Sequence, residues 1–291
     1  PVFDDKAPAP FMIPYTGGNV EHRQAALVMN LAGGGGLEIW SFTSRVSQPL
    51  AFKLQLGDLG INAIRFKTRD LQQAHQWVSS KSKSEVGPIV SFPEGEGFWG
   101  ADPYGNIFQV TSDTSWFQQL NHPVGGVAGA IIGVSDMDQS IQFYKHLITS
   151  LEVVYDKTGI FSDLPSTAAT QKYRRVLLCK KMKAEGAFSK LLGDIQIELL
   201  QAMDRVPKKL FENRFWGDCG YIHLCFDTLD METLQAELKT KGYPFTVDSG
   251  TSFGMDAAAG RFAYVEDPDG TLIELVETHK VPVLKKLGWF L

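Results

Sequence analysis

Cysteine is scarce in this sequence, and the features typical of membrane proteins, secreted proteins and nucleic-acid-binding proteins are lacking. The chain of 291 residues has three cysteines, Cys179, Cys219 and Cys225, whose spacing matches no zinc or redox motif and gives no dense disulfide framework. No apolar run is long enough to span a bilayer, and no signal peptide is visible at the start. The net charge of -5 provides no basic footprint for nucleic acid. We therefore expect a cytoplasmic protein with neither nucleic acid nor membrane as a partner.

The sequence does contain an internal repeat, offset by 160 positions (38 to 198). Glu38 recurs as Glu198, and Gly57-Asp58 recurs as Gly217-Asp218. The turn sequence DPYG at 102–105 recurs as DPDG at 267–270 after a few extra residues. Because the matching residues keep nearly the same offset over this range, they indicate duplication of a structural unit.

Each repeated unit begins with the same pattern. A short apolar strand leads to an aspartate, and an amphipathic helix follows, as at 60–70, 126–136 and 220–230. Further strands come next, such as KYRRVLLCKK and GDIQIELLQ, and the strong turn DPDG separates the last two strands of the final unit. The pattern predicts an α+β protein of tandem βαβββ modules, at about 1–45, 57–117, 126–205 and 217–280, with helices on the outer faces of the sheets.

The modules predict two halves, residues 1–117 and 126–280, followed by a tail at 281–291. The first module is incomplete, because VFDD near residue 3 resembles IFSD near residue 161 but has almost no sequence before it. About 35 residues precede the matching point in the third module, where they supply its first strand and helix. We expect the incomplete module to leave an uncovered sheet edge in its half.

The segments GVSDMDQSIQFY, IELL, YIHLCF and EDPDGTLIELVE together resemble the vicinal oxygen chelate superfamily. That superfamily includes glyoxalase I, extradiol dioxygenases and antibiotic-resistance proteins. The resemblance covers the chain from about residue 57 onward and part of residues 1–45. It implies that two modules pair into a U-shaped sheet that cups a metal ion, with ligands from the first and last strands of each module.

The glyoxalase I ligand pattern maps onto the second half as Gly129, Glu198, His223 and Glu274. Three of these four positions carry a metal-binding side chain, and Gly129 leaves a coordination position open to water or substrate. The resemblance therefore implies a divalent metal ion (Zn, Fe, Mn, Ni or Co) at Glu198, His223 and Glu274. Taken singly, each residue is more typical of a solvated or otherwise satisfied side chain on a strand than of a metal ligand.

The first half has Glu38, Ala63 and Gln109 in the same frame as Glu198, His223 and Glu274. Alanine cannot bind a metal, and the amide of glutamine is a poorer ligand than a carboxylate. We interpret the first half as structural, or as a cryptic binding cup.

The resemblance leads to three hypotheses about function, all with a small-molecule partner. The first is a metal-dependent lyase or isomerase similar to glyoxalase I, with Glu274 as the ligand that also moves a proton. The second is an extradiol-type dioxygenase with Fe(II), a chemistry that uses two histidines and one carboxylate. The third is a binding protein without catalysis. The oligomeric state stays open, since four modules can form both cups within one chain.

Overall fold

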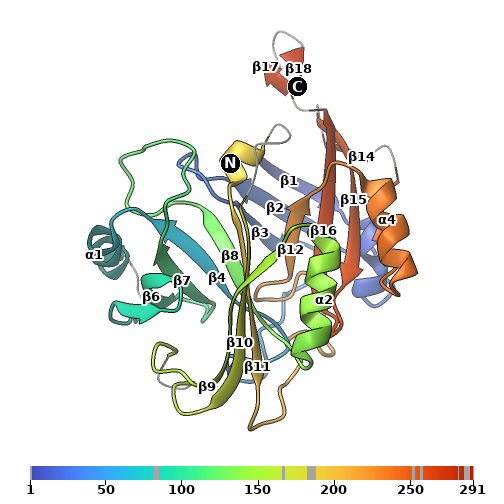
Figure 1. Ribbon diagram of the computed structural model, residues 1–291. Helices are drawn as coiled ribbons and strands as arrows, with labels where there is room; N and C mark the ends of the chain where they lie inside the picture. Colours follow the sequence, from blue (N-terminus) through green and yellow to red (C-terminus); the bar gives the residue numbers. More distant parts are fainter. Residues whose placement is uncertain are drawn as a thin grey trace.

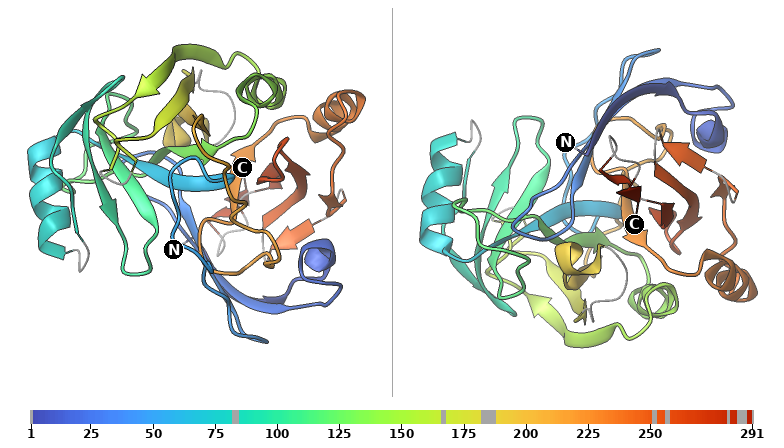
Figure 2. Two further views of the ribbon diagram at one scale, coloured as in Figure 1. Left: turned by 90° about the horizontal axis from the view of Figure 1, so that it is seen from below. Right: turned by 90° about the horizontal axis from the view of Figure 1, so that it is seen from above.

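The computed structural model describes the whole chain except residues 1, 82–84, 166–167, 182–187, 251–252, 256–257, 281, 285–288 and 291. The protein is a mixed α+β structure of curled sheets with few helices, arranged as two lobes (Figures 1 and 2). No helix in the described part of the chain is long and apolar enough to cross a membrane.

The predicted βαβββ order is present in the three complete modules. The second module contains β4 (Gly60–Thr68), α1 (Leu71–Lys81), β5 (Val90–Phe92), β6 (Gly95–Ala101) and β7 (Ile107–Ser112). The third contains β8 (Val127–Gly133), α2 (Met137–Leu147), β9 (Glu152–Ile160), β10 (Lys172–Lys180), the short α3 (Ser189–Leu192) and β11 (Ile195–Ala202). The fourth contains β12 (His223–Asp227), α4 (Met231–Thr240), β13 (Val247–Asp248), β14 (Phe253–Met255), β15 (Ala258–Glu266) and β16 (Leu272–Lys280).

The first module has three strands and no α-helix. Its elements are β1 (Phe3–Pro8), the 3-10 helix η1 (Pro10–Tyr15), β2 (His22–Val28) and β3 (Leu37–Phe42). Of the predicted tail at 281–291, the structure describes only β17 (Pro282–Leu284) and β18 (Trp289–Phe290), which pair with each other.

The strands of each sheet do not all come from one of the two predicted halves, residues 1–117 and 126–280. One eight-stranded sheet, in the order β5-β6-β7-β4-β8-β11-β10-β9, joins the second and third modules through the antiparallel pair β4 and β8. We call its concave side the central cup. The chain passes directly from β7 to β8 through a short link, so these neighbouring modules pair with each other and the boundary at 117–126 runs through one sheet.

The first and fourth modules lie together in the other lobe. Figure 2 shows the N-terminal strands, in blue, beside the C-terminal strands, in red and orange. Their sheets have the orders β1-β2-β3 and β12-β16-β15-β13. We call the space that these two sheets enclose the terminal cup. Two modules far apart in sequence therefore build one cup.

The internal repeat predicted which residues are structurally equivalent. In the parallel pair of β4 and β7, Ala63 lies beside Ile107 and Arg65 beside Gln109. In the parallel pair of β12 and β16, His223 lies beside Leu272 and Cys225 beside Glu274. The two registers are the same, which confirms the predicted match of Ala63 with His223 and of Gln109 with Glu274.

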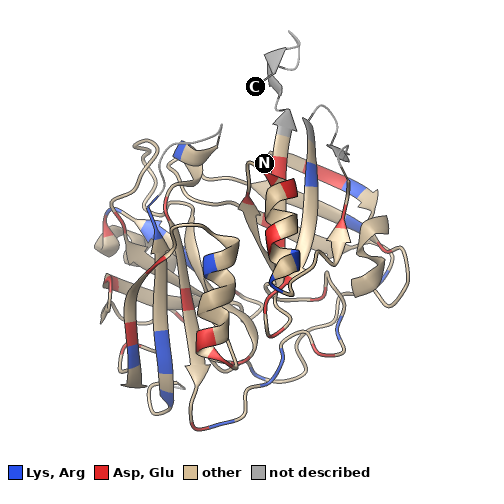
Figure 3. Cartoon of the chain, turned by 45° about the vertical axis from the view of Figure 1, so that its right-hand side comes forward, with Lys and Arg blue, Asp and Glu red and all other residues tan. Residues whose placement is uncertain are grey.

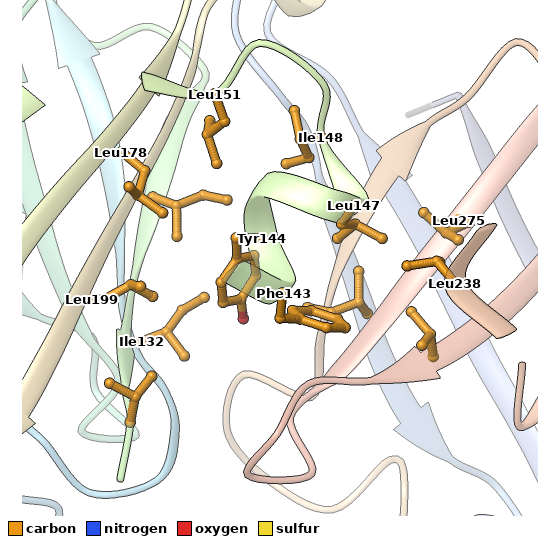
Figure 4. Close-up of a cluster of buried hydrophobic side chains, with 14 of the residues drawn as sticks. Ile132, Phe143, Tyr144, Leu147, Ile148, Leu151, Leu178, Leu199, Leu238 and Leu275 are labelled. Atoms are coloured by element: carbon orange, nitrogen blue, oxygen red, sulfur yellow. The ribbon is translucent and has the colours of Figure 1, made fainter. Parts of the chain in front are cut away.

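Helix α2 packs between the two lobes. Its N-cap Asp136 accepts a hydrogen bond from Gln139 N at 3.0 Å, as Asp230 does from Thr233 N in α4. Before α1, Asp70 accepts from Gln73 N at 2.9 Å, so all three predicted caps are present. Figure 4 shows Phe143 and Tyr144 of α2 between side chains of the central sheet and those of the fourth module. This apolar layer holds the outer faces of the two sheets together.

The predicted open edge lies in the terminal cup. Within the described residues, β3 pairs only with β2, and β12 pairs only with β16. β3 and β12 are both more exposed than β11 and β4, their respective counterparts in the other sheet. Figure 3 shows acidic and basic positions interspersed along the strands and helices of the chain.

Candidate metal centre

Three metal-binding side chains converge in the terminal cup: Glu38 from β3, His223 from β12 and Glu274 from β16. Each offers one ligand atom, and the three atoms lie within 4.8 Å of one another. His223 Nε2 is 3.1 Å from Glu274 Oε2 and 3.8 Å from Glu38 Oε2. We call these residues the Glu–His–Glu cluster.

Strand alternation explains why these side chains face one another. On β12, His223 points into the cup, whereas Leu224 points outward and packs on the apolar core. On β16, the same alternation directs Ile273 and Leu275 outward, where both are buried, and directs Glu274 inward. The apolar residues that flank each polar one therefore fix its orientation.

The electrostatics of the cluster are typical of a cation site. Burial alone would lower the pKa of His223, but the charge and hydrogen bond of Glu274, together with the charge of Glu38, outweigh burial and raise it. Burial raises the pKa of Glu38, against the attraction of His223, and the charge of Glu274 raises it further. Two carboxylates held this close destabilise each other's charged form. A divalent cation would relieve that repulsion, so this donor set fits a metal ion.

Aromatic side chains surround the cluster. The buried Tyr264 lies directly opposite Glu274 on β15 and meets the His223 ring edge-on at 5.4 Å, and burial together with the charge of Glu274 raises the pKa of its hydroxyl. Trp40 follows Glu38 by two residues on the same face of β3, and its ring lies 3.9 Å from that of Trp216. These rings pack beside the three ligand residues. The ring nitrogen His223 Nδ1 is buried and has no hydrogen-bond partner among the described residues.

The structure does not bring Glu198 to His223 and Glu274. Glu198 lies on β11 in the central cup, is 2% exposed and forms an ion pair with Arg175. Arg65 lies 3.3 Å from the same carboxylate and adds a second positive charge. Burial opposes ionisation of Glu198, but the two guanidinium groups outweigh burial and lower its pKa. Glu38, its repeat partner, takes the position that sequence analysis assigned to Glu198.

The central cup carries guanidinium groups where the terminal cup has its cluster. Arg65 Nε donates to Gln109 Oε1 at 2.8 Å, and Arg175 also pairs with Asp163 at 2.5 Å. Gly129 lies beside Gln196 on β11, whose backbone oxygen would be 2.0 Å from an added Cβ, so this glycine opens no position near His223. The ligand-poor cup is therefore built from the second and third modules, whereas the sequence had suggested the first half.

The signal that would have found Glu38 was already in the repeat, which aligns it with Glu198. The error lay in pairing modules by their order in the chain. Arg174 and Arg175 are adjacent on β10, so strand alternation directs them to opposite faces of the sheet. Arg175 is buried inside the cup, and Arg174 lies outside, bonded to Asp138 and Asp156.

Comparisons with known proteins agree with this architecture. Glyoxalase I from Zea mays superposes with a TM-score of 0.56 at 16% sequence identity, covering 88% of this chain and 79% of that one. A Bacillus subtilis protein assigned provisionally as a dioxygenase has a TM-score of 0.56 at 14% identity, covering 89% of this chain and 73% of that one. At these identities the likeness concerns the fold alone. No curated protein sequence matches the chain.

A sequence profile covers more than half of the chain. Residues 119–275 match the profile of the Glyoxalase/Bleomycin resistance protein/Dioxygenase superfamily. This range contains β8 to β11 and most of the fourth module, including His223 and Glu274. The chain belongs to the Glyoxalase/Bleomycin resistance protein/Dioxygenase superfamily, the vicinal oxygen chelate proteins.

Proposed function

We propose that the protein is a metal-dependent vicinal oxygen chelate enzyme with its metal ion at Glu38, His223 and Glu274. The observation that carries this proposal is the convergence of the three ligand atoms within 4.8 Å in a cup lined by aromatic side chains. This assignment replaces Glu198 of the sequence-based set with Glu38. A bound divalent ion would act as a Lewis acid that stabilises negative charge on two neighbouring oxygens of a small substrate.

The reaction we favour is proton transfer between two adjacent carbons of the substrate, as in a lyase or isomerase of the glyoxalase I type. A carboxylate of the cluster removes the proton from one carbon and returns it to the next. Sequence analysis suggested Glu274 for this role. We assign it to Glu38, because Glu274 lies 3.1 Å from His223 Nε2 and beside the buried Tyr264, whereas the side chain of Glu38 is 27% exposed on an open edge strand.

The exposure of Glu38 suits this role, because a substrate can reach its carboxylate from the open edge. Tyr264 would hold Glu274 in place through its hydroxyl. Trp40 and Trp216 would keep water from the reacting carbons. The cytoplasm is the compartment we assign, since Cys179, Cys219 and Cys225 form no disulfide.

The extradiol dioxygenase hypothesis is less well supported by this ligand set. That chemistry uses two histidines and one carboxylate, whereas the cluster has one histidine and two carboxylates. The third hypothesis, binding without catalysis, predicts a protein that needs no metal ion.

Elemental analysis of protein purified without added metal tests the proposal. We expect one divalent ion per chain, and His223→Ala should lose it while remaining folded, since Ala63 occupies the equivalent place in the central cup. The loaded protein should then isomerise a hemithioacetal without consuming oxygen. Iron together with substrate-dependent oxygen uptake would favour the dioxygenase. Failure to bind any of the ions of Zn, Fe, Mn, Ni or Co would contradict the proposal and favour the hypothesis of a binding protein without catalysis.

A further inference from the structure

An open slot separates the two sheets of the terminal cup. Its sides are β3 and β12, and within the described residues neither strand has a backbone partner on the side that faces the other. The two edges lie close to each other, because Glu38 of β3 and His223 of β12 bring side-chain atoms to 3.8 Å. The slot is therefore bounded on both sides by backbone N–H and C=O groups that no neighbouring strand pairs.

The central sheet shows what fills the same place in the other lobe. β8 lies between β11 and β4, parallel to the first and antiparallel to the second. Its residue Ile131 is the register partner of both Glu198 and Ala63. The internal repeat makes these two residues the counterparts of Glu38 and His223. The slot therefore has the position of one extended strand that runs parallel to β3 and antiparallel to β12.

The sides of the slot set the length and the residue pattern of such a strand. β3 has six residues and β12 has five, so a strand of five residues can pair along both edges. Ile39 on the outer face of β3 is 60% exposed, whereas its counterpart Leu199 is fully buried and lies beside Ile132 of β8. An apolar residue of the added strand at that place would cover Ile39. Residues on the other face would point into the cup beside the cluster.

A slot with two edges differs from the single edges elsewhere in the molecule. β9, for example, ends the central sheet and offers hydrogen bonds on one side only. A strand in the slot has neighbours on both sides, so all of its backbone groups find partners. Strand addition of this kind gains affinity from main-chain hydrogen bonds and specificity from alternate side chains. The slot therefore selects an extended polypeptide.

No described strand of the chain is free to enter the slot. Each is already paired in one of the sheets, and the two short strands of the tail, β17 and β18, pair with each other. A second copy of the chain would have to break one of these pairs to donate a strand. A segment of a different polypeptide requires no such break.

We propose that the slot binds an extended segment of a partner polypeptide, which adds a strand between β3 and β12. The segment resembles β8 in its small and apolar residues and contains no proline. A bound segment would also close the side of the cup on which Glu38 is exposed, so a substrate would have to enter through the mouth of the cup. That consequence rests on the proposed function, whereas the strand addition does not.

Fluorescence anisotropy of the metal-free protein with a labelled peptide tests this proposal. The peptide carries residues 126–134, GVAGAIIGV, which include β8, with lysines added at both ends for solubility. We expect saturable binding of one peptide per chain. The peptide variant Ile132→Pro keeps an apolar residue but removes a backbone donor, and it should bind at least about tenfold more weakly.

Two matched substitutions on the protein locate the bound peptide. Ile39→Ser removes an apolar contact beside the slot and should weaken binding about tenfold. Ile160→Ser makes the same change on the edge strand β9, where the isoleucine is 65% exposed, and should leave binding unchanged. The peptide should also slow alkylation of Cys225, whose counterpart Arg65 is buried beside β8. Alkylation of Cys219, which is exposed like Cys225, should keep its rate.

Several results would overturn the proposal. They are absence of saturable binding, equal binding of the proline variant, unchanged alkylation of Cys225, and a loss of affinity caused by Ile160→Ser rather than by Ile39→Ser. An oligomer of the protein that the peptide dissociates would also overturn it, since the strand would then come from a second copy. The two peptides keep the test valid on the wild-type protein if Ile39→Ser fails to fold. Because the protein is metal-free, a failure here is separate from a failure of the metal centre.

Discussion

Replacing a single carboxylate tests whether the metal ion is bound by Glu38, as the structure indicates, or by Glu198, as the sequence suggested. Glu38→Gln keeps the size of the side chain and removes its charge from the Glu–His–Glu cluster. Glu198→Gln makes the same chemical change at the equivalent position of the central cup. The structure predicts that only the first variant loses metal affinity, and that only the second loses much stability.

The expected loss at Glu38 follows from its distance and exposure. Its carboxylate is 3.8 Å from His223 Nε2, and its side chain is 27% exposed. Two unit charges about 4 Å apart interact by about 4 kcal/mol at an effective dielectric constant near 20, and partial exposure reduces this value. We therefore expect the metal Kd of Glu38→Gln to rise roughly 100- to 1000-fold, since each 1.4 kcal/mol is a factor of ten.

The expected loss at Glu198 is one of stability. Its carboxylate is buried against Arg65 and Arg175, and removing one partner of a buried ion pair costs about 3–5 kcal/mol. The melting temperature should fall by on the order of 10 °C, with metal affinity within about threefold of the wild-type protein. The assay is metal titration with thermal melting of both variants. If Glu198→Gln loses the metal while Glu38→Gln retains it, the assignment of the cluster is wrong.

Three further predictions concern the groups around the two cups. Tyr264→Phe removes a buried hydroxyl from the register partner of Glu274. If that hydroxyl orients the Glu274 carboxylate, metal binding should weaken about 10- to 100-fold, the usual effect of losing a group that orients a ligand. Metal titration checks this, and unchanged affinity would argue against that role. Arg175→Met leaves the negative charge of Glu198 partly unpaired and should lower the free energy of unfolding by about 3–5 kcal/mol. Arg175→Met combined with Glu198→Leu should lower it by less, because the double variant leaves no unpaired carboxylate at this position. Denaturant unfolding gives both values, and additive effects of the two substitutions on the free energy of unfolding would show that the residues are not coupled. Burial raises the pKa of Asp267 from 3.8 to about 6, so its contribution to stability is fully present below pH 3.8 and is lost as the pH rises through 6. Asp267→Asn should abolish this pH dependence and raise the free energy of unfolding at pH 8 by up to roughly 3 kcal/mol. A variant that is no more stable than the wild-type protein at pH 8 would contradict the predicted direction of the effect.

Much of the local structure could be predicted because it depends on neighbours in the sequence. The caps Asp136 and Asp230, the inward orientation of Glu274 and the equivalence of Ala63 and His223 all follow from patterns within a module. The partner of each module depends on long-range packing, here the layer around α2 and the pairing of β4 with β8. No periodicity encodes that choice, which is why Glu38 was placed in the wrong cup.

The tyrosine and tryptophan groups around the cluster were missed for a related reason. Tyr264 reads as an ordinary core residue of an apolar strand, and Trp40 has no motif of its own. Their role becomes visible only when β3, β15 and β16 are placed side by side. By contrast, the two guanidinium groups of the central cup explain how a carboxylate such as Glu198 can lie in an apolar strand without a metal ion.

The pairing of the first module with the fourth has a consequence for how the protein is made. During synthesis the central cup is complete once β11 has emerged at Ala202, because all its strands lie between residues 60 and 202. The Glu–His–Glu cluster can form only after Glu274 has been synthesised, 236 positions after Glu38 (274 minus 38). Strands β1 to β3, which precede the central cup in the chain, remain without their partner sheet throughout that interval, when exposed strand edges are most prone to aggregation. A break in the link at 118–126 would give fragments that each hold half of both cups, so neither fragment alone would contain the metal centre.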